Sequence, residues 1–182
     1  MKKAIDLYKI GEKLEFNDSR ELTNGKRSEG KLTIQPGKKG PPPHIHIQQI
    51  EGFEVLNGSM VAIINGKETL LKKGETVIVK AGEAHTFRNG SNSEELVARF
   101  WYEPALNMEF MLQTLGESAM ENGGDWAKAP ILPTMYLLYK AREEYRIAGI
   151  PFRLQDVLLG AFAGLAKLTG VHKKISLPED WK

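Results

Sequence analysis

The sequence predicts a mainly β protein, a sandwich or barrel of short strands, followed by an α-helical C-terminal segment. Between residues 53 and 102, short apolar runs recur at regular spacing, and glycine follows nearly every one. From Ala105 onward this alternation stops and apolar residues take helical spacing. Short strands separated by turns are typical of sandwiches and barrels. We therefore expect a β domain over residues 1–104 and an α-helical extension over residues 105–182, packed on or near it.

The expected strands follow from alternating apolar residues bounded by turn signals. Asn65-Gly66 is the strongest hairpin signal in the chain. The prolines at 41–43 remove three backbone donors, so this stretch is expected to be an extended arm. The strands from 53 onward are expected to form an antiparallel meander. The predicted strands are 13–16, 31–34, 53–56, 60–64, 69–71, 76–79, 85–88 and 95–102.

Three helices are expected in the extension. The first covers residues around 106–115, and the second runs from Met135 to Ala148 with Thr134 as its N-cap. The third runs from Leu154 to Thr169 and is apolar on more than one face. Packing of this helix under the others is the preferred interpretation. A dimer contact, a peripheral membrane patch or a lid on the barrel mouth are the alternatives.

Composition excludes several classes of protein. The chain has 182 residues, a net charge of +2 and no cysteine. The small net charge gives no argument for nucleic acid, and the lack of cysteine excludes disulfides and thiolate ligands. The sequence contains no apolar run of the length of a membrane span and no signal peptide at the N-terminus. We expect a cytoplasmic protein that binds a small molecule and no nucleic acid.

The candidate functional residues begin at His44-Ile45-His46. In a strand, residues i and i+2 face the same side, so both imidazoles project together and can bind one ion. Glu51 has the opposite parity, so the chain must turn between Ile47 and Ile50 for its carboxylate to converge. His85 would come from a neighbouring strand. Taken alone, a His-x-His pair is equally consistent with surface or hydrogen-bonded histidines.

The joint pattern resembles the cupin family. Its first motif, His-x-His, three or four residues, Glu, six residues and Gly, is matched by His44, His46, Glu51 and Gly58. Its second motif is matched from Gly74 to Asn89 and includes His85, although Lys80 stands where proline is expected. The leading glycine of the first motif falls on Lys38, with Gly37 and Gly40 beside it.

The resemblance implies a double-stranded β-helix, the jelly-roll barrel of cupins, with one divalent metal held by His44, His46, Glu51 and His85. Iron, manganese, nickel, copper and zinc all suit three imidazoles and one carboxylate. It also implies a homodimer. A metal-dependent enzyme of dioxygenase type, in which Glu51 could accept a proton, is the first functional hypothesis. The alternatives are a metal-stabilised binding or sensory module without turnover and, with less support, a sugar-type isomerase.

Four further polar residues have plainer interpretations. Gln48 and Gln49 are expected to be polar loop residues, with hydrogen bonding to the metal ligands as the alternative. Arg99 shares a strand face with Trp101, opposite the apolar residues of that strand, and is a weak candidate for contact with an anionic substrate. His172 is expected at the surface.

Overall fold

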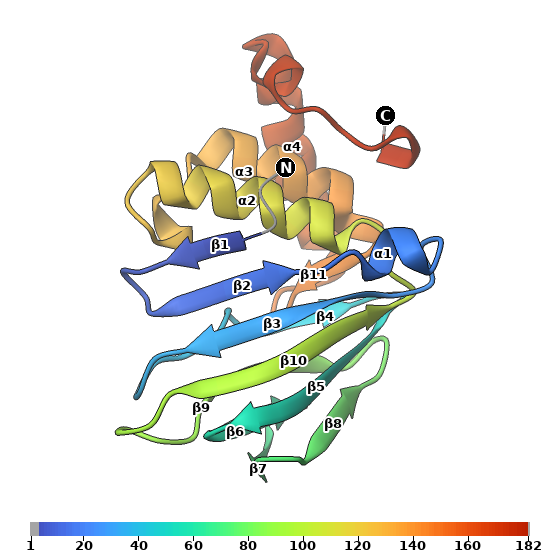
Figure 1. Ribbon diagram of the computed structural model, residues 1–182. Helices are drawn as coiled ribbons and strands as arrows, with labels where there is room; N and C mark the ends of the chain where they lie inside the picture. The colour runs from blue at the N-terminus through green and yellow to red at the C-terminus, as the bar shows by residue number, and fades with distance from the viewer. Residues whose placement is uncertain (1–3, 182) are drawn as a thin grey trace.

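The computed structural model describes residues 4–181 and shows two antiparallel sheets that face each other, with helices along one side (Figure 1). Within this part of the chain the strand orders are β1-β2-β3-β10-β5-β8 and β11-β4-β9-β6-β7. The predicted β-barrel with a helical C-terminal segment is confirmed. The strands are β1 (Ala4–Leu7), β2 (Glu12–Phe16), β3 (Ser28–Ile34), β4 (His44–His46), β5 (Ile50–Asn57), β6 (Ser59–Ile64), β7 (Lys67–Lys72), β8 (Thr76–Val79), β9 (Ala84–Asn89), β10 (Leu96–Glu103) and β11 (Tyr145–Ile147).

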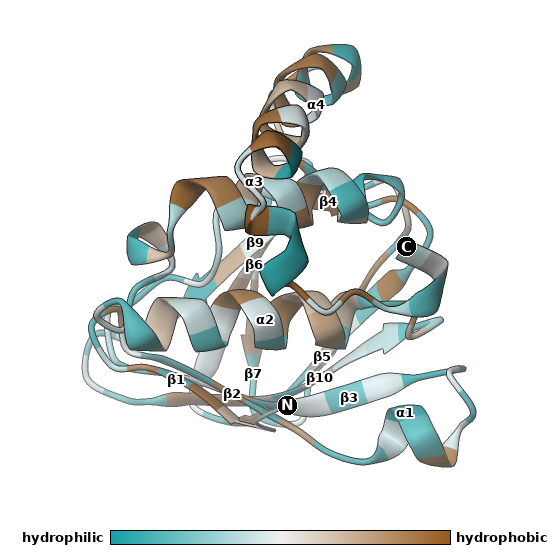
Figure 2. Cartoon of the chain, turned by 90° about the horizontal axis from the view of Figure 1, so that it is seen from above, coloured by the Kyte–Doolittle hydropathy of each residue, from teal (hydrophilic) through white to brown (hydrophobic). Residues whose placement is uncertain are grey.

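The C-terminal helices lie beside the β1 edge of the six-stranded sheet (Figure 1). Figure 2 shows α4 projecting away from the rest of the molecule. The α-helices are α1 (Ser19–Leu22), α2 (Met108–Glu121), α3 (Ile131–Lys140) and α4 (Phe152–Leu168). Short 3-10 helices are η1 (Trp126–Lys128), η2 (Ala141–Glu143), η3 (Val171–Lys174) and η4 (Glu179–Trp181).

The expected meander is wrong, because consecutive strands mostly change sheet. β5 pairs with β10 and β8, whereas β6 pairs with β9 and β7. Crossing between facing sheets lets both inner faces bury their apolar side chains in one core. The β6–β7 hairpin is confirmed. Its turn residues Asn65 and Gly66 both have positive φ, as the favoured two-residue hairpin turn requires.

The core follows the predicted alternation. On β10, Leu96, Ala98, Phe100 and Tyr102 are buried, while Arg99 is exposed. Arg99 pairs on the outer face with Glu54, at 2.6 Å between Nη2 and Oε2. Arg99 therefore points away from the interior, and its predicted role in contacting an anionic substrate finds no support.

The second predicted helix is wrong in its C-terminal half. The helix α3 ends at Lys140, and Tyr145–Ile147 forms strand β11, which pairs with β4. Thr134 lies inside α3, whose N-cap is Pro130. Helical spacing from 135 to 148 did not reveal this, because pairing with β4 is a contact across about a hundred residues of sequence. The helical extension thus contributes an edge strand to the barrel.

A buried carboxylate, Glu144, fixes this extension to the barrel. It accepts hydrogen bonds from the backbone and side-chain nitrogens of Asn107, at 2.9 and 3.0 Å, and from Nε1 of Trp181, at 2.8 Å. Its own carbonyl accepts from the nitrogen of Ile47. Four segments distant in sequence are therefore joined at one residue.

The third predicted helix exists as α4, and its expected packing against the other helices is only partly correct, because one face packs against α3 and the opposite face is exposed. One face, including Leu159, Ala163 and Ala166, is buried, whereas Val157 and Leu168 are 69% and 87% exposed. Among residues 4–181, no helix is both long and apolar enough to cross a bilayer.

Candidate metal centre

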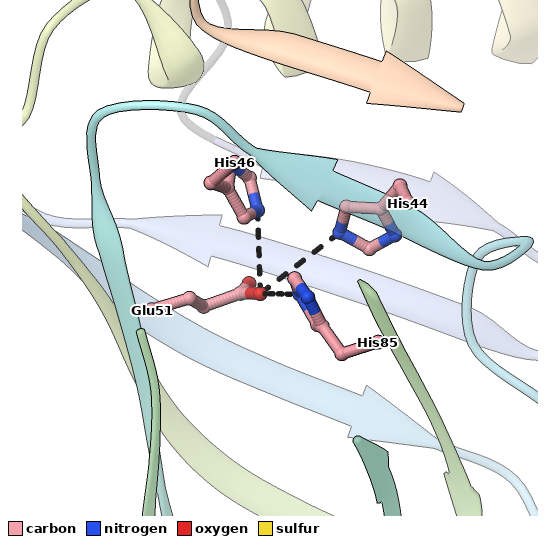
Figure 3. Close-up of side chains that lie close together, drawn as sticks. All are labelled: His44, His46, Glu51 and His85. Atoms are coloured by element: carbon pink, nitrogen blue, oxygen red, sulfur yellow. Dashed lines mark hydrogen bonds and ion pairs between the residues drawn. The ribbon is translucent and has the colours of Figure 1, made fainter. Parts of the chain in front are cut away.

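Three strands bring the predicted residues together (Figure 3). His44 and His46 project from one face of β4, and the chain bends at Ile47 and Gln48 before β5 begins. This bend supplies the predicted change of parity, and Glu51 joins Phe53 and Val55 on the buried face of β5. His85 lies opposite His44 in the β4–β9 pair.

The four side chains are buried and close. Their possible ligand atoms all lie within 4.8 Å of one another, and each residue is less than 5% exposed. Oε2 of Glu51 lies 2.6 Å from Nε2 of His85, 3.4 Å from Nε2 of His46 and 3.9 Å from Nε2 of His44. All three imidazoles therefore direct Nε2 toward one carboxylate oxygen.

Backbone carbonyls orient two of the rings. Nδ1 of His44 donates to the carbonyl of Pro42 at 2.9 Å, and Nδ1 of His85 donates to that of Glu83 at 3.0 Å. A carbonyl can only accept, so Nδ1 carries the proton in both rings and Nε2 is left as the ligand atom. This is the arrangement that commonly supports metal-bound histidine.

Both ring nitrogens of His46 lack a hydrogen-bond partner among the described residues, although the ring is 1% exposed. An unsatisfied buried polar atom costs about 1–3 kcal/mol. A cation at the cluster would bind Nε2 and remove the penalty at that atom. Three imidazoles and one carboxylate are a donor set suited to first-row transition metals, so the residues present fit the metal that the sequence predicts.

Electrostatics in the cluster favour an ionised Glu51 beside neutral His44. Burial alone would raise the pKa of the Glu51 carboxyl. The hydrogen bonds and charges of His46 and His85 lower this pKa by more than burial raises it, so the pKa lies well below the ordinary value. Burial, aided by the charges of the other two histidines, lowers the pKa of His44 to about 3. Burial opposes protonation of His85, yet its hydrogen bond to Glu51 raises the pKa. Without metal, the proton in the cluster therefore resides on His85.

Two tyrosines, Tyr102 and Tyr145, lie beside the cluster, and the sequence pattern did not single them out. Burial raises the pKa of the Tyr102 hydroxyl well above its usual range, and the charge of Glu51 and a hydrogen bond to it raise the pKa further. The ring of Tyr145 stacks on His44, with centroids 5.2 Å apart and an interplanar angle of 24°. The strand alternation of β10 could have placed Tyr102 on the inner face, near the cluster. Nothing in the local sequence indicated that residue 145 lies on a strand.

The other polar residues fall outside the cluster. Gln49 is fully buried and donates from Nε2 to the carbonyl of Ala105 at 2.8 Å, which fixes the bend before Glu51. Gln48 bonds instead to the carbonyl of Glu143. His172 is half-buried, and its Nδ1 donates to the carbonyl of Ala166, so the expected surface position is only partly correct.

Comparison with known proteins gives one family match. The family model described as a cupin domain matches residues 30–102, which include all four cluster residues. A search of curated proteins finds no match.

Solved structures similar to part of this chain include three cupin-fold proteins. A predicted oxalate decarboxylase from Thermotoga maritima is 24% identical, with 50% of this chain and 79% of that chain covered and a TM-score of 0.47. An RmlC-like cupin from Shewanella frigidimarina is 17% identical, with coverages of 58% and 86% and a TM-score of 0.47. A sugar phosphate isomerase from Silicibacter pomeroyi is 20% identical, with coverages of 51% and 59% and a TM-score of 0.44, so the chain spans less than two thirds of its length.

Two facing antiparallel sheets that enclose three histidines and a glutamate define a β-barrel protein with a potential metal centre. The matched domain carries both the strands and the cluster. The chain contains a cupin domain, which the family model matches over residues 30–102, and C-terminal helices follow it.

Proposed function

We propose that this protein is a metal-dependent enzyme of dioxygenase type that acts on a small organic molecule. His44, His46, Glu51 and His85 would hold one divalent ion of iron, manganese, nickel, copper or zinc. The observation that carries the proposal is the buried His46, whose unpartnered Nε2 is directed at the Glu51 carboxylate. When bound, such an ion supplies Lewis-acid activation and a template for substrate oxygens.

The chain's own residues would orient the substrate and handle its proton. Glu51 is ionised, since its pKa is well below the ordinary value, and its carboxylate could accept a substrate proton once its bond with His85 loosens. His44 is neutral at pH 7 and is held by Pro42 and Tyr145. The apolar side chains that line the neighbouring cavity would limit the water around a bound substrate.

Metal content tests the first step. The full-length protein should contain one equivalent of transition metal after purification or after reconstitution with each of the five ions. His46→Ala should lose this binding, while His172→Ala should keep it, because His172 lies outside the cluster. A wild-type protein that takes up no stoichiometric metal would refute the proposal.

Turnover is tested next. The metal-loaded protein should consume dioxygen with catechols or enolisable 1,3-diketones, as measured by an oxygen electrode and product analysis. Glu51→Gln should abolish uptake. Saturable binding of these compounds without product, under oxygen and with metal loaded, would instead establish the second candidate, a binding or sensory module.

The structure gives the isomerase alternative less support. A sugar phosphate carries many hydroxyl groups that need polar partners, whereas the cavity beside the cluster is lined mainly by apolar side chains. The cytoplasmic location and the homodimer stay predictions, which cell fractionation and light scattering would test.

A further inference from the structure

A large cavity lies between the barrel and the helices, next to the metal-ligand cluster. Its volume is about 650 Å3, and both His44 and Glu51 line it. The inner faces of β2, β3 and β10 line it from the barrel side, and α2, η1 and α3 from the other. The apolar lining includes Leu14, Leu32, Phe100, Met111, Leu115 and Leu138.

The size and lining of the cavity indicate an organic ligand. Sites for small organic molecules usually enclose roughly 300–1,000 Å3 and combine apolar walls with a few polar groups. Here the lining lysines Lys9, Lys38 and Lys39 are exposed, so their charges lie at the solvent side of the cavity. Away from the cluster, the buried lining holds one carboxylate among the described residues, Glu12.

Glu12 is unusual for a core position. It lies on the buried face of β2 with Leu14 and Phe16 and is 4% exposed. Among residues 4–181 its carboxyl has one hydrogen-bond partner, Nε1 of Trp126 on η1, at 3.2 Å, and it forms no ion pair. The bond engages Oε2 and leaves Oε1 for another donor or acceptor. Burial, only partly offset by that bond, raises the pKa of Glu12 to about 7.

Glu12 and Glu51 occupy separate regions of the same sheet. The strand order places β3 and β10 between β2 and β5. Three strand spacings correspond to roughly 14 Å between the axes of β2 and β5. A single ligand that contacts both carboxylates must therefore be elongated.

We propose that the cavity binds an elongated, mainly apolar molecule, with an oxygen-bearing end at the metal-ligand cluster and a polar group near its other end hydrogen-bonded to Glu12. The proposal rests on the proposed function for the first contact. Glu12 acts here as a positioning residue. A buried carboxyl without a cation partner destabilises the fold, and such groups are commonly retained for binding or catalysis.

Two probes that differ by one hydroxyl test the contact with Glu12. They are 4-(2-phenylethyl)benzene-1,2-diol and its 4′-hydroxy derivative, titrated calorimetrically into the metal-loaded full-length protein. The wild type should bind the derivative about tenfold more tightly, since one buried hydrogen bond contributes about 1 kcal/mol or slightly more. Glu12→Leu should lose this preference and Glu12→Gln should retain it.

Glu15→Leu is the matched control, because Glu15 lies on the same strand but faces solvent, where it pairs with Lys13 and Lys31. It should preserve the preference of the wild type. A preference that persists in Glu12→Leu would overturn the role of Glu12. Absence of binding by both diols to the metal-loaded wild type would overturn the ligand class.

An oxygen-free dye separates this inference from the proposed function. N-phenyl-1-naphthylamine fluoresces in apolar surroundings and should bind the metal-free protein, with displacement by the unsubstituted diol. Displacement is the readout because exposed apolar residues of α4 offer the dye a second place. Metal uptake without displaceable dye binding would refute the cavity and leave the proposed metal centre intact. Displaceable dye binding without metal uptake would support the cavity and refute the metal enzyme.

Discussion

Replacing Glu12 by glutamine tests whether burial keeps this carboxyl protonated near neutral pH. The folded protein raises the pKa of Glu12 from 4.5 to about 7. Between these values the folded state binds more protons than the unfolded state. The resulting stabilisation is complete below pH 4.5 and is lost as the pH rises through about 7.

Linkage gives the size of the effect. A difference of about 2.5 between the two pKa values corresponds to about 3 kcal/mol in the free energy of unfolding, of which about 2.5 kcal/mol falls between pH 5 and pH 8. Glutamine has no titrating group and can still accept the bond from Trp126. The wild type should therefore lose about 2.5 kcal/mol relative to Glu12→Gln over this interval.

Urea unfolding followed by far-UV circular dichroism measures the difference, because tryptophan fluorescence would report the local contact with Trp126. Both proteins should be free of metal, so that titration of the histidine cluster is common to the two and cancels. Glu15→Gln, on the solvent face of β2, controls for a general loss of negative charge. A difference between wild type and Glu12→Gln that does not change with pH would refute the reasoning.

Three further predictions concern the cluster and the packing around it. Metal affinity should fall by about tenfold per pH unit below the raised pKa of His85, because the metal must displace the proton that His85 carries. Competition titrations with a chelator measure the affinity at each pH, and an affinity that stays constant from pH 8 to pH 5.5 would contradict this prediction. Gly52→Ala should destabilise the protein by about 2–3 kcal/mol in urea unfolding, since a Cβ there would overlap the indole on β10. Gly160→Ala, in which the new Cβ would lie 3.9 Å from its nearest neighbour, should instead stabilise the protein by about 0.5–1 kcal/mol. Equal changes in unfolding free energy for the two variants would contradict the close packing at Gly52. Tyr145→Ala should weaken metal binding about tenfold by freeing the ring of His44, whereas Tyr145→Phe should not; equal affinities in calorimetry would refute the stacking role.

The strands and the cluster could be predicted because they depend on local parity and turns. His44 and His46 share a face of β4 as any alternate strand residues do, and the opposite parity of Glu51 required the bend observed at Ile47 and Gln48. His85 was placed by the resemblance to cupins rather than by local sequence. Whether these four residues bind a metal stays a prediction.

The cavity and β11 could not be predicted, because both depend on where the C-terminal segment packs. Glu12 alternates with apolar residues of β2, but only the position of Trp126 shows that this face is covered. Tyr145 follows a sequence of helical spacing, and only its pairing with His46 makes it a strand residue. Local patterns contain no information about such distant partners.

The pairing of β11 with β4 also has a consequence for biosynthesis. The histidine strand emerges from the ribosome about a hundred residues before its neighbour in the sheet. Chains fold as they are made, from the N-terminus onward, so β4 waits with one edge unpaired until residues 145–147 have been translated. A nascent or truncated chain that ends before β11 would expose this edge and hold its histidines without the covering tyrosine. We expect such chains to need chaperone protection, and metal capture to follow release of the finished polypeptide.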